Sequence, residues 1–158
     1  MLTSEKLIEI YNILYDAFGA QHWWPGETKI EIAVGAILTQ NTSWSNVKKA
    51  ITNLKDADCL SAQKLHEIKI EELVQLIKPA GYFNIKAKRL KNFMNWFFDE
   101  YSCDFEMLEN ISTSLLREQL LSINGVGRET ADSILLYALE RPIFVIDAYT
   151  ARIAQRHH

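Results

Sequence analysis

The sequence predicts an all-α fold, and three observations lead to that class. Apolar residues recur at spacings of three and four along most of the 158 residues, which is the period of helices packed on one face. Glycine, proline and capping residues divide the chain into segments of helical length. The one strand-like run, at residues 142–146, is too short to build a sheet.

The expected elements follow in order from these signals. A first helix over residues 4–18 ends at Gly19, and a second over 28–38 opens with the capping-box pair Thr28 and Glu31. Ser43 can cap a third helix. Later helices are expected at residues 61–67, 70–77, about 85–101, 113–122 and 128–140, and the short apolar run after Pro142 leads into a last one.

Composition limits the possible functions. Hydrophobic residues make up 48% and charged residues 23% of the chain, which suits one globular domain, alone or with a small appendage. No apolar run reaches transmembrane length and the N-terminus is no secretory signal, so we expect a cytoplasmic protein. Cys59 and Cys103 lie far apart in the sequence, so we expect reduced thiols and neither a disulfide nor a pair of metal ligands. A net charge of −3 argues mildly against nonspecific coating of nucleic acid.

A local basic stretch qualifies that charge balance. Residues 84–93 carry Lys86, Lys88, Arg89 and Lys91 with no acidic residue among them. Because screened fields act over about 10 Å, such a stretch can form a positive face on an acidic protein. The alternative is an ordinary solvated helix face, and the sequence leaves both open.

Two glycines separate the helices expected at 113–122 and 128–140. Glycine in the left-handed backbone region closes a helix end, and Gly127 lets a ligand approach the free N–H groups at the start of the next helix. Such a turn can bind a phosphate without reading a base. The alternative is an αα-hairpin whose glycines serve the turn alone.

Four stretches together resemble the endonuclease III-like, helix–hairpin–helix DNA glycosylases. They are ILTQNTSW at residues 37–44, PAGYFNIKAKRL at 79–90, LLSINGVGRETA at 120–131 and FVIDAYTAR at 144–152. The resemblance implies a helical bundle of two lobes that binds double-stranded DNA containing a damaged base. It divides the chain into an N-terminal helix of the second lobe (1–24), a helical domain with the hairpin at about 113–140 (25–141), and a catalytic segment (142–158).

The resemblance also assigns roles to individual residues. Asp147 matches the catalytic aspartate, although an Asp at this place can also be only a helix N-cap. Gln40 would fill the gap left by a flipped nucleotide, and Tyr82 or Phe83 would wedge the opposite strand. Lys86 and Lys88 would meet DNA phosphates, and the other expected DNA-binding residues are Gly125, Val126, Gly127, Arg128 and Thr130.

Residue 129 departs from the bifunctional members of that family. They carry a lysine there, whose amine attacks the sugar and then cleaves the strand through a Schiff base. Glu129 cannot form an imine, and neighbouring Arg128 stays protonated. This implies a monofunctional glycosylase without lyase activity. The plainer interpretation, that an acidic residue favours a helix N-terminus, is compatible with it.

The tryptophans resemble those of the branch that releases 3-methyladenine. Trp23, Trp24 and Trp44, with Asn41 as a weaker candidate, would form the base pocket. An alkylated purine is cationic, so an aromatic face attracts it by about 0.5–2 kcal/mol beyond stacking. The alternative for each tryptophan is ordinary core packing.

Further expectations concern cofactors and completeness. Two cysteines cannot hold the iron–sulfur cluster that many members carry, so we expect no cluster and no metal site; a monovalent cation at the hairpin is compatible with the resemblance. Family members continue with more helices, so the second lobe is expected to be incomplete here. A noncatalytic or truncated helix–hairpin–helix DNA-binding module is therefore the alternative function. The sequence indicates no oligomeric state.

Overall fold

The computed structural model describes residues 3–21 and 24–157, and within these ranges it is helical without strands, which confirms the all-α prediction. Short 3₁₀ helices η1 (Lys78–Ala80) and η2 (Glu106–Leu108) and a π-helix, η3 (Ile134–Ala138), join the longer elements. The α-helices are α1 (Ser4–Phe18), α2 (Lys29–Leu38), α3 (Trp44–Asp56), α4 (Ala62–Glu67), α5 (Ile70–Leu76), α6 (Phe83–Tyr101), α7 (Thr113–Ser122), α8 (Arg128–Ser133) and α9 (Ala148–Arg156).

The chain forms two compact units. The core unit is Gly26–Val145, and the terminal unit combines Met1–Pro25 with Ile146–His158. Every buried side chain among the described residues lies between Ile30 and Ala138, inside the core unit. In the terminal unit, α1 starts at the Thr3 cap and ends at Gly19 with φ +66°, as the sequence predicts for its end.

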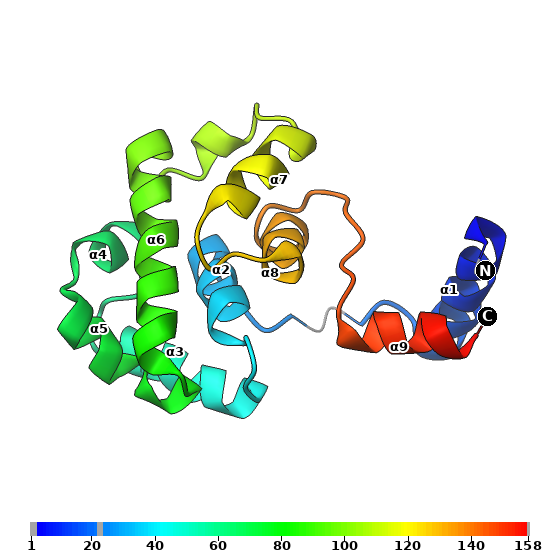
Figure 1. Ribbon diagram of the computed structural model, residues 1–158, viewed down its shortest axis with the longest axis horizontal. Helices are drawn as coiled ribbons and strands as arrows, with labels where there is room; N and C mark the ends of the chain where they lie inside the picture. The colour runs from blue at the N-terminus through cyan, green and yellow to red at the C-terminus, as the bar shows by residue number, and fades with distance from the viewer. Residues whose placement is uncertain (1–2, 22–23, 158) are drawn as a thin grey trace. The chain divides into compact units, whose positions relative to one another are not determined.

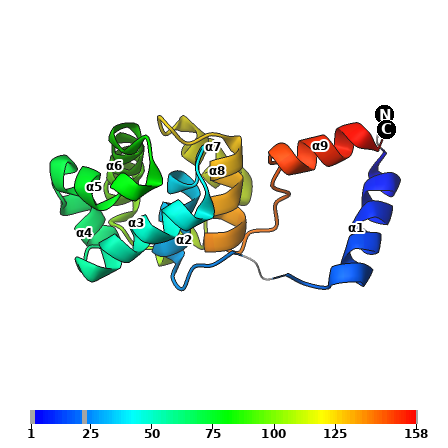
Figure 2. The same ribbon diagram turned by 90° about the horizontal axis from the view of Figure 1, so that it is seen from below.

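Helix α2 occupies the centre of the core unit (Figures 1 and 2). It packs against α3, α6, α8 and η3, while α4 and α5 pack along α6. Because α2 is apolar on all sides, most of its residues can be buried at once. Gly35 permits close packing with α3, since a Cβ there would lie 3.1 Å from Cη2 of Trp44.

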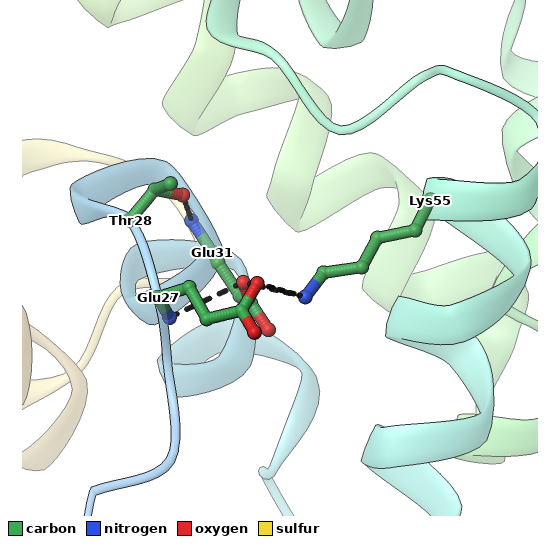
Figure 3. A network of polar contacts seen from close by, with 4 residues as sticks. All are labelled: Glu27, Thr28, Glu31 and Lys55. Carbon is green, nitrogen blue, oxygen red and sulfur yellow. Dashed lines mark hydrogen bonds and ion pairs between the residues drawn. The ribbon is translucent and has the colours of Figure 1, made fainter.

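A polar network fixes the start of α2 to the end of α3 (Figure 3). The Thr28 hydroxyl accepts from the Glu31 amide at 3.2 Å, which confirms the predicted cap. The Glu31 carboxylate is buried and accepts from the Glu27 amide at 3.3 Å, one residue earlier than in the usual capping box. Lys55 of α3 pairs with Glu31 at 3.0 Å and with Glu27 at 2.9 Å, and these hydrogen bonds raise the pKa of Lys55.

The segment expected as one helix over 128–140 changes type along its length. It is an α-helix to Ser133 and a π-helix over η3, where the Leu139 amide donates to the Ile134 carbonyl at 3.1 Å. The π turn lies where η3 packs against α2. Apolar spacing does not distinguish the two helix types over five residues.

Candidate nucleic-acid interface

The turn between α7 and α8 is a β-turn that needs glycine at its third residue. After α7, Ile123 is extended, and the Val126 amide donates to the Ile123 carbonyl at 3.0 Å. Gly125 has φ +100°, as a type II turn requires. The expected positive φ is therefore present, but it serves the turn two residues beyond Ile123 and not the helix cap itself.

Arg89 of α6 makes glycine obligatory at residue 125 for a second reason. A Cβ on Gly125 would lie 2.2 Å from the Cγ of Arg89, so the Arg89 stem lies directly against the turn. Asn92, one helical turn later, donates to the Asn124 carbonyl at 3.0 Å. Helix α6 therefore supports the turn at both Gly125 and Asn124, a role that the sequence did not indicate.

Gln40 connects the loop after α2 to the same turn. Its amide nitrogen donates to the Gly125 carbonyl at 3.1 Å and to the Thr130 hydroxyl at 3.0 Å, and its oxygen accepts from Arg89. Gln40 is thus held within the protein by three partners. To fill a gap in DNA, its amide would have to leave Gly125 and Thr130.

The surface of the hairpin is open at the start of α8. Gly127 is extended at φ −90° and serves as the N-cap, and no atom lies within 4 Å of the position of a Cβ. Gly127, Arg128 and Glu129 are exposed. The side chains of Val126 and Thr130, however, face the interior, at 5% and 6% exposure. Contacts from these two residues to a phosphate would have to come from the backbone.

A bidentate ion pair holds the two hairpin helices together. Arg117 of α7 donates to both carboxylate oxygens of Asp132 in α8, with distances of 2.6 Å from Nε and 3.1 Å from Nη2. Asp132 is buried, and its hydrogen bonds raise the pKa of Arg117. Neither residue was among the sequence candidates, because a pair fifteen residues apart gives no local signal.

The basic stretch of α6 does not form a positive face. Lys86 is only 1% exposed, and its amine donates to the carbonyls of Leu38 and Ala80, each at 2.8 Å. Burial, with the nearby charge of Arg89, lowers the pKa of Lys86. Lys91 donates to carbonyls at the end of α4, and of the four cations only Lys88 is exposed. The expected phosphate contact of Lys86 is therefore wrong, whereas Lys88 is accessible for one.

The two wedge candidates differ in exposure. Tyr82 is 69% exposed and has a left-handed backbone at φ +46°, immediately before α6. Phe83 is half-buried, and the Lys78 amine lies 5.9 Å from the centre of its ring. Tyr82 is therefore the better placed of the two to meet another molecule.

The pocket candidates are spread over both units. Trp44 is half-buried and packs over Gly35, as the core-packing alternative expects, while Asn41 is exposed with φ +53°. Trp24 is half-buried in the terminal unit. Trp23 lies outside the described residues. The core unit brings together Gln40, Arg89 and the hairpin but contains neither Trp24 nor Asp147.

Asp147 is the N-cap of α9. Its Oδ1 accepts from the Thr150 amide and from the Thr150 hydroxyl, both at 2.7 Å. The side chain is half-buried, and Oδ2 takes no hydrogen bond from the part of the chain that the structure describes. The cap fixes the direction of the carboxylate through one oxygen and leaves the second for another partner, so a cap and a catalytic role are compatible.

Within residues 3–21 and 24–157, no three histidine, cysteine, aspartate or glutamate side chains cluster as metal ligands would. No helix in these ranges is both long and apolar enough to cross a membrane.

Comparison with known proteins agrees with this geometry. The chain is 54% identical over 153 residues to a candidate DNA repair glycosylase of Methanocaldococcus jannaschii, covering 96% of this chain and 70% of the relative. It is 30% identical to endonuclease III of Thermotoga maritima, covering 79% of this chain and 54% of that protein.

Solved structures show the same fold. The 3-methyladenine DNA glycosylase of H. pylori, bound to 1,N6-ethenoadenine, superposes with a TM-score of 0.78 at 32% identity, covering 96% of this chain and 70% of that one. An endonuclease III–DNA complex gives a TM-score of 0.79 at 20% identity. Residues 34–158 match the family model described as HhH-GPD superfamily base excision DNA repair protein. This chain therefore belongs to the HhH-GPD superfamily of base excision DNA repair proteins.

Proposed function

We propose that the protein is a monofunctional DNA glycosylase that binds double-stranded DNA and releases an alkylated purine from it. The observation that carries the proposal is the carboxylate of Asp147, which is oriented through Oδ1 and takes no hydrogen bond at Oδ2 from the described residues. Cleavage of a glycosidic bond to a cationic base leaves positive charge on the sugar. A carboxylate about 4 Å away stabilises such a charge by about 4 kcal/mol at an effective dielectric of 20. It can also accept the proton of the attacking water.

The hairpin supplies the DNA contacts in this proposal. The exposed backbone N–H groups at the start of α8, with Gly127 open to approach, suit one phosphate oxygen. Lys88 adds a second contact, which is cationic. These contacts position the duplex without reading its sequence. The solved 3-methyladenine glycosylase that resembles this chain supports alkylated purines as the substrate class. A tryptophan ring would stack on the flipped base, which costs least to unstack when it is damaged.

Replacing Asp147 with asparagine tests catalysis separately from binding. Asn is as good an N-cap as Asp, so Asp147→Asn keeps the start of α9 while removing the charge. We expect the wild type to release methylated purines from alkylated duplex DNA and the variant to release them about 100-fold more slowly, with an unchanged Kd for the duplex. If both proteins bind DNA and neither releases a base, the protein is a noncatalytic DNA-binding module.

Borohydride trapping tests the monofunctional route. An imine between protein and sugar is reduced to a stable covalent adduct, whereas a water-using enzyme leaves none. Glu129 offers no amine, so we expect no adduct with duplex DNA that carries the substrate base, while a bifunctional family member trapped in parallel shows one. Efficient capture of this protein would overturn the monofunctional assignment.

A further inference from the structure

Lys86 occupies an unusual place for a lysine. It is among the largest fully buried side chains, at 1% exposure, and no carboxylate of the described residues pairs with it. Its amine instead donates to two carbonyls, those of Leu38 and Ala80, at 2.8 Å each. Burying an amine costs free energy, which these two bonds offset in part, so the burial of Lys86 needs a structural reason.

Both carbonyls are the last of a helix. Leu38 ends α2 and Ala80 ends η1, and terminal carbonyls lack a donor within their own helix. A cation there also complements the negative end of the helix dipole. One amine on α6 therefore closes two helix ends that lie 42 residues apart in the chain, as counted from Leu38 to Ala80.

Each of these carbonyls lies two residues before a candidate DNA contact. Gln40 follows Leu38, and Tyr82 follows Ala80. The Gln40 side chain is in turn bonded to Gly125 and Thr130 of the hairpin. Lys86 thus joins the two helix ends that lead into the Tyr82 loop and the Gln40 loop, and the Gln40 side chain joins its loop to the hairpin.

We propose that Lys86 is a positioning residue that sets the spacing between the Gln40 loop (residues 39–42) and the Tyr82 loop (residues 81–83). The inference rests on the proposed function, in which both loops meet DNA beside the flipped nucleotide. Tyr82 has the exposed ring and the left-handed backbone of a residue held in place for contact. Without the amine, the two helix ends lose their shared donor, and Tyr82 loses its fixed distance from Gln40.

Lys91 provides a matched control on the same helix. Its amine donates to the carbonyls of Leu65, His66 and Ile68 at the end of α4, and burial lowers its pKa as it does that of Lys86. The chemistry is the same, but α4 carries no candidate DNA contact. Lys91 is half-buried, and a purely structural effect of losing an amine that caps carbonyls should appear in both Lys86→Met and Lys91→Met.

A double-mutant cycle with Tyr82→Ala on the full chain provides the test, with Kd measured for a duplex that contains an abasic-site analogue. In the wild type and in Lys91→Met, Tyr82→Ala should weaken binding about tenfold, as loss of one stacked ring does. In Lys86→Met it should weaken binding less than about twofold, because the ring is already misplaced. A tenfold effect in all three backgrounds would overturn the proposal for Lys86.

The remaining outcomes are also decisive. If wild-type binding does not respond to Tyr82→Ala, the DNA role of that loop fails, and the inference fails with it. Absence of any duplex binding by the wild type contradicts the proposed function itself. If Lys86→Met is unfolded at the assay temperature, Lys86→Gln replaces it in the cycle, because the shorter amide keeps a donor for one carbonyl while the link between the two helix ends is still broken. Should both be unfolded while Lys91→Met folds, Lys86 serves the core alone and the positioning role is refuted.

Discussion

The two glycines of the hairpin are required for different reasons. Gly125 has a positive φ and lies against the Arg89 stem, so the fold itself excludes a side chain there. Gly127 has an ordinary extended backbone and no neighbour within 4 Å, so nothing inside the protein excludes one. The fold therefore does not explain why residue 127 is glycine. The proposed phosphate contact does, because a side chain there would obstruct the start of α8.

Alanine at each glycine should separate stability from binding. Gly125→Ala introduces a clash and a strained backbone, which we expect to lower the free energy of unfolding by about 2–4 kcal/mol. Gly127→Ala should lower it by no more than about 1 kcal/mol, the cost of a weaker N-cap, yet reduce duplex affinity. Urea denaturation and Kd measurements check both. A stable Gly125→Ala, or a Gly127→Ala with unchanged Kd, would contradict these roles.

At the level of elements, capping residues and apolar spacing predicted the helix bounds that depend on neighbouring residues. The bounds of α7 match the prediction because Ser112 accepts from the Leu115 amide and the turn follows directly. The basic stretch of α6 shows the limit of such signals. Lys86, Arg89 and Lys91 turn to carbonyls and to Gln40, partners 6 to 49 residues away, and only the tertiary fold brings these together. Charge counting along a sequence cannot distinguish a buried donor from an exposed one.

The same limit applies to the candidate site. The N-cap bond of Asp147 is present and could be expected from one short stretch, whereas its catalytic role stays a prediction. The sequence did not indicate that Arg89 and Arg117 support the hairpin, because each of them contacts a residue outside its own helix. Trp44 packs against Gly35 although its motif indicated a pocket, since a ring that begins α3 also faces α2.

The Arg117–Asp132 ion pair should contribute more to the stability of the hairpin than an ion pair between two exposed side chains does. Asp132→Asn keeps the shape but leaves Arg117 without its bidentate partner, so we expect a loss of about 1–3 kcal/mol in the free energy of unfolding. Glu118→Gln, at an exposed carboxylate next to Arg117 on α7, should change it by less than about 0.5 kcal/mol. Equal effects of the two changes in urea denaturation would show that the pair does not hold the helices together.

At the scale of the whole molecule, the buried core and the proposed catalytic carboxylate belong to different units. The buried side chains of the described residues all belong to the core unit, as do the hairpin, Gln40 and Lys86. Asp147 and α9 belong to the terminal unit, where no described residue is buried. Under the proposed function, a change in the terminal unit should therefore alter the reaction while the core unit keeps its stability and its affinity for DNA.

Removal of residues 146–158 should show this division directly. Because no buried side chain is lost, the unfolding midpoint should fall by less than about 3 °C, which corresponds to under about 1 kcal/mol. The hairpin is intact, so the Kd for duplex DNA should stay within about threefold of the full chain, while release of methylated purines disappears with Asp147. Asp147→Asn in the full chain is the matched control, since it should lose release without losing α9. A midpoint lowered by more than about 8 °C would mean that α9 stabilises the core unit, and retained base release would mean that the reaction does not use Asp147.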